Sequence, residues 1–250
     1  MPRAISPGDV FLDVFDQAPR RELEPGEVLI HAGETATDVF NVINGMLMIS
    51  RFGRDGRRQV LGFLFPDNFV GLTATDKYFF TVEAVTPTVI ASRNREFLDQ
   101  RLAGDTVAER AFAAMVFRVL ENLVDLAYSL GQRTARERLA VFVLYLRHRY
   151  RLSTGVPDDD DQLLTLELPM SRADIADFLG LKKETVSRSF GQLESAGFIR
   201  RAGSEQVHLL DISGLRELAG VHDFASPARL EDNTRPVTTS GPRSISRNSR

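Results

Sequence analysis

The chain has 250 residues, of which 43% are hydrophobic and 26% charged, enough apolar material for two modest cores in one polypeptide. It contains no cysteine, which excludes disulfides, cysteine-ligated zinc and cysteine-bound iron–sulfur clusters. The net charge of −3 gives no overall attraction to nucleic acid, so any such contact must come from a local basic surface. We see no apolar run long enough to span a membrane and no signal-like N-terminal segment, and therefore expect a cytoplasmic protein.

Short apolar segments separated by turn signals fill residues 23–91, a rhythm typical of β-strands. Asn44-Gly45 separates residues 39–43 from residues 46–49 and predicts a hairpin of these two segments. A second hairpin is predicted around Asp55-Gly56. A compact antiparallel sandwich or jelly roll accommodates this many short strands.

From about residue 105 the hydrophobic period becomes helical, with apolar residues at alternating steps of three and four. Such a stripe often packs on a neighbouring domain of the same chain. Its place between two domains instead favours a homodimer interface. The residues predicted to form this interface are Ala113, Val116, Leu120, Leu123, Ala127 and Leu130.

After Gly131 a second helix is predicted over residues 134–149, followed by a solvated loop over residues 152–162. The four aspartates at 158–161 could suggest a metal site, but a run of carboxylates without a scaffold is typical of an exposed turn. After residue 224 the chain is rich in Arg, Ser, Thr and Pro, and we expect a disordered tail.

The most specific pattern lies in residues 168–201. Ser171 is a good N-cap for a short helix ending at Leu179, Gly180 allows a tight turn, and a second helix is predicted over residues 183–195. Small and apolar residues at this spacing let two short helices cross closely, as a helix-turn-helix requires. Two short segments after this motif, separated by a glycine, predict a β-hairpin wing.

The exposed N-terminal half of the second helix carries side chains suited to DNA. Arg188 can donate to guanine O6 and N7, Glu184 can accept from cytosine N4, and Ser187 can contact a neighbouring base. The alternative is that Glu184 and Arg188, four residues apart, form a surface ion pair. The residues predicted to contact phosphates are Ser171, Arg172, Lys182, Thr185, Arg200 and Arg201.

The predicted fold is α+β. Its parts are a β jelly roll over residues 1–104, a dimerisation helix over 105–131, a winged helix-turn-helix domain over 132–224 and a disordered tail over 225–250.

Over residues 20–218 the chain resembles the CRP/FNR superfamily, and most closely its FixK-like branch. Besides the helix-turn-helix, residues 131–138 resemble the segment after the family's dimerisation helix, and residues 69–72 (FVGL) fall where the cyclic-nucleotide branch carries its phosphate cassette. The resemblance implies a cyclic-nucleotide-binding-like jelly roll as sensor, a dimer helix and a winged helix-turn-helix. It also implies a transcription activator with double-stranded DNA, a second copy of the chain and RNA polymerase as partners.

Glu184, Ser187 and Arg188 are similar to the residues with which FNR-type proteins read an inverted repeat with TTGAT-like half-sites. Lys183 departs from the residue types expected at its position, so it either reads a base there or holds a phosphate. By the same resemblance, the target genes would concern low-oxygen respiration, nitrogen oxides or nitrogen fixation.

Members that bind cyclic nucleotides carry a glutamate after the cassette glycine and an arginine further on. This chain has Leu72 and the aromatic run Tyr78-Phe79-Phe80 there, so we expect no cyclic AMP and no cofactor. His31, near a predicted turn, suits a surface role better than haem ligation. The sequence leaves open an effector-independent regulator, or a receptor for a nucleotide, haem or unidentified apolar ligand.

A jelly-roll enzyme of the cupin type is the alternative from a different functional class. Such an enzyme needs several metal-binding histidines and carboxylates from separate strands, and the jelly-roll region contains one histidine. We therefore predict neither catalysis nor a metal site.

Overall fold

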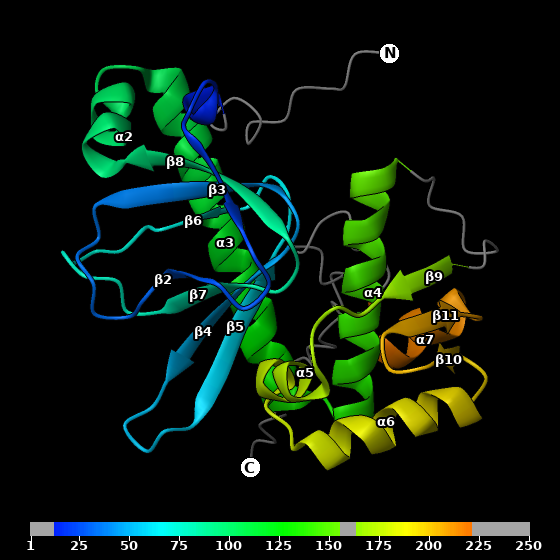
Figure 1. Cartoon of the computed structure of the whole chain (residues 1–250). Coiled ribbons are helices and arrows are strands. Elements are labelled where there is room, and N and C mark those ends of the chain that lie inside the picture. The colour runs from blue at the N-terminus through cyan, green and yellow to red at the C-terminus, as the bar shows by residue number, and fades with distance from the viewer. Residues whose placement is uncertain (1–12, 156–163, 222–250) are drawn as a thin grey trace, which may run out of the picture.

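The computed structural model describes residues 13–155 and 164–221. Its N-terminal half is a jelly roll of two four-stranded antiparallel sheets, with strand orders β1-β8-β3-β6 and β2-β7-β4-β5 (Figure 1). This part of the prediction is confirmed. A short 3-10 helix, η1 (Asp13–Phe15), comes before the strands. The strands are β1 (Arg20–Leu23), β2 (Val28–Ile30), β3 (Asp38–Asn44), β4 (Leu47–Phe52), β5 (Arg58–Leu64), β6 (Phe69–Val70), β7 (Thr81–Ala84) and β8 (Thr88–Asn94).

The predicted hairpin at Asn44-Gly45 is wrong. β3 pairs with β8 and β6, whereas β4 pairs with β5 and β7 in the other sheet. Gly45 has φ +87°, and a Cβ there would lie 2.7 Å from the Thr88 Cα. A tight hairpin and a corner between two sheets both need a glycine with positive φ, so the dipeptide did not distinguish them. The second predicted hairpin, β4 with β5 around Gly56, is confirmed.

Six α-helices follow these eight strands in the described part of the chain. The long helix begins after Asp105, whose carboxylate accepts from the N–H groups of Val107 and Ala108, and it continues through Gly131. The helices are α2 (Arg95–Leu102), α3 (Thr106–Gln132), α4 (Ala135–Thr154), α5 (Arg172–Leu179), α6 (Lys183–Ser195) and α7 (Ile212–Ala219). None of them is long and apolar enough to cross a membrane.

Helix α4 begins with a capping box formed by Thr134 and Glu137. It runs five residues beyond the predicted end at 149, so the loop predicted from residue 152 starts too early. Gly155 ends the helix in the left-handed conformation, at φ +70°. The predicted aspartate run and the predicted tail lie outside the described residues.

The C-terminal domain packs α5, α6 and α7 around α4, beside a three-stranded sheet of order β10-β11-β9 (Figure 1). β10 (Ile199–Ala202) and β11 (Gln206–Leu209) form the predicted wing. β9 (Leu164–Glu167) was not predicted, and it pairs with β11. The domain is thus a winged helix-turn-helix with one additional strand.

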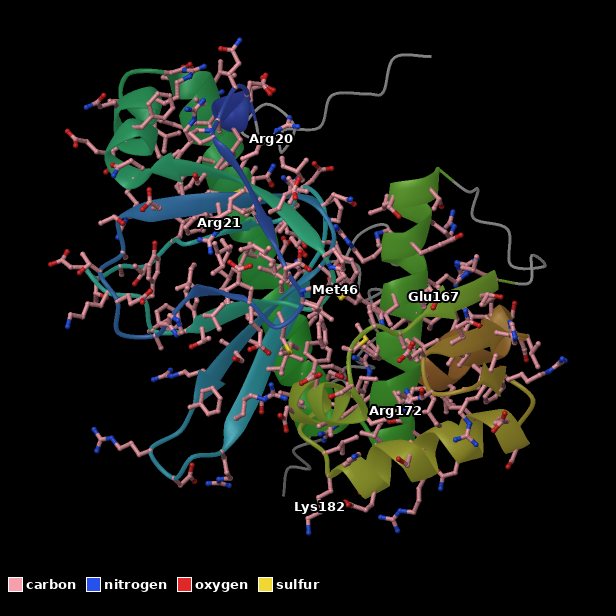
Figure 2. All side chains as sticks on the ribbon, in the orientation of Figure 1. Arg20, Arg21, Met46, Glu167, Arg172 and Lys182 are labelled. Atoms are coloured by element: carbon pink, nitrogen blue, oxygen red, sulfur yellow. The ribbon has the colours of Figure 1, made fainter. Side chains whose placement is uncertain are left out.

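The two domains share a hydrophobic core. Met46, Val60 and Phe63 of the jelly roll belong to the same buried cluster as the core of the C-terminal domain. The Phe63 ring lies 6.0 Å from the Phe142 ring of α4 and 5.5 Å from the Phe178 ring of α5, measured between centroids. In Figure 2 Met46 lies at the boundary between the jelly roll and α4. This packing fixes the helix-turn-helix against the jelly roll.

Candidate nucleic-acid interface

The turn between α5 and α6 has the close packing that the sequence predicted. Ser171 caps α5 and forms a capping box with Asp174. Gly180 ends α5 at φ +62°, and a Cβ at that position would lie 3.2 Å from the Leu130 Cδ2 atom. Both the backbone angle and the space therefore favour glycine. The buried residues between the two helices are Ile175, Ala176, Leu179, Val186, Phe190 and Leu193.

Helix α6 separates a buried face from an exposed one. Val186, Ser189 and Phe190 face the core and are buried. The four residues predicted to read bases are all exposed on one side of the helix: Lys183, Glu184, Ser187 and Arg188. The structure thus brings the predicted base-reading set together on one surface.

The alternative interpretation of Glu184 and Arg188 finds no support in the structure. Within residues 13–155 and 164–221 no ion pair joins their side chains. Arg188 Nη2 makes only a long contact of 3.4 Å with the Thr185 hydroxyl, and the Ser187 hydroxyl donates to the Lys183 carbonyl at 3.1 Å. The Arg188 guanidinium therefore keeps most of its donors for an external acceptor.

The start of α6 is open to an anion. Lys182 is the N-cap residue and its side chain makes no capping hydrogen bond. The first turn of a helix carries unpaired N–H groups and a partial positive charge, which suit a phosphate. Figure 2 shows Lys182 at this end of α6, projecting away from the body of the molecule. Lys182 and the half-exposed Thr185 thus flank the base-reading surface.

The Arg172 side chain is not freely exposed, although the sequence predicted it to contact phosphate. Its guanidinium stacks 3.9 Å above the centre of the Phe190 ring. Burial and the neighbouring Arg201 lower the pKa of Arg172, and its Nη1 is buried without a hydrogen-bond partner among the described residues. Packing against α6 is therefore one role of this side chain, whether or not it also meets DNA.

The two wing arginines differ from each other. Arg201 donates from Nε and Nη2 to Glu194 Oε2, at 2.8 and 2.6 Å, and its backbone N–H donates to Oε1 at 3.0 Å. These hydrogen bonds hold the pKa of Glu194 below its usual value. Arg200 on the neighbouring position is exposed. Arg201 thus already fastens the wing to α6, which the sequence did not indicate.

A groove that the sequence did not predict runs between the start of α4 and α6. Its lining includes the N-cap residue Thr134 and Arg136 at the start of α4, and three residues of α6, Arg188, Gln192 and Ser195. Arg136 is exposed and becomes a further candidate phosphate contact next to Arg188. The only sequence signal was the density of arginines in residues 131–138, which gave no indication of distance to α6.

Helix α3 leaves most of its apolar stripe uncovered. Only Ala108, Ala111 and Ser129 of its 27 residues are buried. Val116, Leu120 and Leu123 are 39%, 53% and 48% exposed, so the predicted stripe does not pack on the jelly roll of its own chain. Four further apolar residues extend it: Phe117, Val119, Val124 and Tyr128. Ala113 and Ala127 are exposed as well.

Leu130 is the member of the predicted interface that lies apart. It is half-buried and packs toward Gly180, at the junction of α3 with the helix-turn-helix. Its carbonyl accepts a hydrogen bond from Arg138 at 2.7 Å. Within one chain Leu130 therefore connects the long helix to the C-terminal domain.

In the jelly roll the cassette region is apolar. Gly71 has φ +112°, and a Cβ there would lie 2.7 Å from the Asp38 carbonyl oxygen. Tyr78 and Phe80 are buried inside the jelly roll, and the Tyr78 hydroxyl donates to the Asp38 carbonyl at 2.7 Å. Burial raises the pKa of Tyr78. His31 is exposed, and the described residues include no group of three potential metal ligands.

Comparison with known proteins matches both domains. A cyclic nucleotide-binding domain family matches residues 20–111 and a Crp-like helix-turn-helix domain family matches residues 137–218. The nitrogen fixation regulation protein FixK of Azorhizobium caulinodans is 35% identical over 185 residues, 74% of this chain and 73% of that protein. The transcriptional activator protein FnrA of Stutzerimonas stutzeri is 32% identical over 213 residues, 84% of each chain.

Among solved structures, FixK2 from Bradyrhizobium japonicum is similar, with a TM-score of 0.73 and 30% identity over 82% of this chain and 99% of that one. In this chain the exposed face of helix α6, a winged domain and a jelly roll occur together. The chain belongs to the CRP/FNR family and is a DNA-binding transcription regulator of the FixK/FNR type.

Proposed function

We propose that the protein binds an inverted repeat with TTGAT-like half-sites as a homodimer, through helix α6 of each subunit. The observation that carries this proposal is the single exposed surface formed by Lys183, Glu184, Ser187 and Arg188, with no carboxylate held to Arg188 in the described chain. Arg188 would read guanine, Glu184 cytosine and Ser187 a neighbouring base. Lys183 would read a base or hold a phosphate.

Phosphate contacts would surround this surface and set its register on the duplex. Lys182 and Thr185 would make these contacts from the start of α6, and Ser171 and Arg172 from the start of α5. Arg200 would act from the wing, and Arg136 from the groove beside Arg188. For Arg201, DNA would compete with its hydrogen bonds to Glu194.

Dimerisation would use the exposed stripe of α3. A helix that buries three of its 27 residues and exposes Phe117, Leu120, Leu123 and Val124 needs a second apolar surface. The same stripe on a second copy, packed about a two-fold axis, supplies it. This pairing would place the two α6 helices in successive major grooves, about 34 Å apart.

Binding would not require a small-molecule effector. Apolar side chains, with Tyr78 and Phe80 among them, pack the interior of the jelly roll, and its cassette region offers Leu72 where cyclic-nucleotide binders carry a charged ribose ligand. The alternative remains a receptor whose DNA affinity depends on a nucleotide, haem or an apolar molecule. Relatives named as a nitrogen fixation regulation protein and a transcriptional activator support an activator of nitrogen-metabolism genes. Low-oxygen target genes, a cytoplasmic location and contact with RNA polymerase belong to the same proposal.

Two measurements on purified full-length protein test this proposal. Selection of bound fragments from genomic DNA should return palindromes with TTGAT-like half-sites. Fluorescence anisotropy should then show tight binding to these sites without any added ligand. Adding a cyclic nucleotide should not lower the dissociation constant further. Binding that appears only with a nucleotide, or with protein showing a Soret band, would favour the receptor alternative. Equal affinity for selected and random DNA would reject sequence-specific regulation.

A further inference from the structure

Arg58, at the start of β5, connects the jelly roll to the first helix of the helix-turn-helix. Its guanidinium donates from Nε to Asp177 Oδ2 at 2.8 Å and from Nη2 to Asp174 Oδ1, and both carboxylates belong to α5. Glu83 of β7 lies nearby, with Oε1 3.8 Å from Nη1. All four side chains are between 17% and 31% exposed. One cation thus faces three carboxylates in a half-buried site.

The contact constrains the position of α5 in more than one direction. Asp174 and Asp177 are three residues apart and lie on the same face of the helix. A planar guanidinium that donates to both restricts rotation and sliding of the helix, which a lysine ammonium cannot do equally well. Next to Arg58, Gln59 donates to the Asp177 carbonyl at 2.6 Å.

Asp174 carries this restraint to the DNA-facing end of α5. While one of its oxygens accepts from Arg58, the other accepts from the Ser171 N–H at 2.9 Å and the Ser171 hydroxyl at 2.6 Å. Ser171 begins α5, and the next residue, Arg172, stacks on Phe190 of α6. The carboxylate therefore links the jelly roll to the residues that support the recognition helix.

We propose that Arg58 is a positioning residue for DNA binding, which holds α5 and therefore α6 at the orientation that two-fold symmetric half-sites require. Arg58 acts through Asp174 and Asp177 and does not itself contact DNA. Without it, three neighbouring carboxylates lose their shared cation and repel one another. The jelly roll thereby contributes to DNA affinity with no ligand bound, an inference that rests on the proposed function.

The test compares R58A, R58K and D177N with the wild type in anisotropy titrations on the selected palindrome. We expect R58A to weaken binding roughly tenfold, R58K to recover only part of the loss and D177N to weaken binding less than R58A. The double variant R58A/D177N should bind no worse than R58A, because D177N then removes a contact that is already broken and one of the unpaired charges. R57A is the matched control and should leave affinity unchanged, since the Arg57 side chain is 89% exposed and its ion pair in the described part of the chain is with Asp55 alone.

Further readouts separate positioning from other roles. The dimer mass in sedimentation should stay constant, and the slope of log affinity against log salt should not change. A slope smaller by about 0.9 would show that Arg58 contacts a phosphate directly, and would overturn the proposal. The proposal would also be overturned if R58A melted at a lower temperature but, while folded, bound the palindrome with wild-type affinity. Arg58 would then form an ion pair that only stabilises the fold. Failure of the wild type to prefer the palindrome would instead reject the proposed function.

Discussion

The guanidinium of Arg138 donates from Nη1 to the Leu179 carbonyl oxygen at 3.0 Å. Its Nη2 donates to the Leu130 carbonyl at 2.7 Å and its Nε to the Arg133 carbonyl at 2.9 Å. One side chain of α4 thus joins the end of α3 to the end of α5. Through this junction the proposed pairing of two long helices would reach the helix-turn-helix.

Replacing Arg138 with alanine should lower the free energy of unfolding by about 1–3 kcal/mol, because three carbonyl groups lose a charged donor. Urea unfolding followed by circular dichroism measures this. Arg136→Ala, two residues earlier and exposed, is the control and should change stability by less than about 0.5 kcal/mol. Equal losses in the two variants would show that the Arg138 contacts do not stabilise the junction.

Leu123→Glu should convert a dimer into a monomer, since it places a charge in the exposed stripe of α3. Sedimentation equilibrium should report half the mass, and affinity for the palindrome should fall by roughly a hundredfold as the two half-sites lose their linkage. Asn122→Glu adds the same charge one residue away, on another face of the helix, and should stay dimeric. An unchanged mass for Leu123→Glu would place the dimer contact elsewhere.

Arg188→Ala should weaken binding to the palindrome by about 1–3 kcal/mol and relax the preference at one base pair. Anisotropy with single-base variants of the site measures both effects. If Arg188→Ala lost equal affinity for specific and random DNA, the assignment of Arg188 as a base-reading residue would not stand.

Lys182→Ala, by contrast, should weaken binding to specific and random DNA alike and reduce the slope of log affinity against log salt by about 0.9. Anisotropy titrations at several salt concentrations measure this slope.

The acid sensitivity of the protein should depend on Asp174. Burial raises its pKa, but hydrogen bonds from Ser171 and Arg58 outweigh this and leave the pKa below its usual value. A depressed pKa stabilises the fold at neutral pH, and this contribution is lost as pH falls through the folded-state value. Asp174→Asn should therefore be less stable than the wild type at pH 7, with a difference that shrinks below about pH 4.

Urea unfolding at a series of pH values measures this difference. Asp76→Asn, in an exposed loop without a charged partner in the described structure, serves as the control and should follow the wild-type curve. A gap between Asp174→Asn and the wild type that stayed constant down to pH 2.5 would mean that the carboxylate charge does not contribute.

Gly45 and Gly56 offer a matched pair of substitutions to alanine. Both have positive φ, +87° and +79°, which costs an alanine about 1 kcal/mol. At Gly45 a Cβ would also meet the backbone at Thr88, whereas at Gly56 no atom lies within 4 Å. Thermal unfolding should show a loss of about 3 kcal/mol or more for Gly45→Ala and about 1 kcal/mol for Gly56→Ala. Equal losses would mean that the corner relaxes around the added methyl group.

The sequence predicted those features that depend on neighbouring residues. The Ser171 cap, the turn at Gly180 and the span of α6 follow from local chemistry, and the structure has them where expected. The exposed side of α6 follows from its 3.6-residue period, so the candidate base-reading surface was also accessible to prediction.

Features that depend on long-range contacts were not predicted. The corner at Gly45 is decided by its approach to Thr88, and β9 exists because it pairs with β11, where partners such as Glu167 and Gln206 are far apart in the sequence. The pairing of Arg201 with Glu194 and of Arg58 with α5 joins residues on different elements. No periodicity in the sequence encodes these distances. The groove that brings Arg136 beside Arg188 has the same origin.

The spacing of half-sites is decisive for the proposed dimer geometry. In the proposed dimer, two α6 helices held by one α3 pair would reach successive major grooves only when the half-sites face the same side of the duplex. Inserting five base pairs, about half a helical turn, between the half-sites of the selected palindrome should therefore reduce affinity to the level of a single half-site. If protein of dimeric mass bound the site with the insertion as tightly as the original site, the proposed dimer geometry would be wrong.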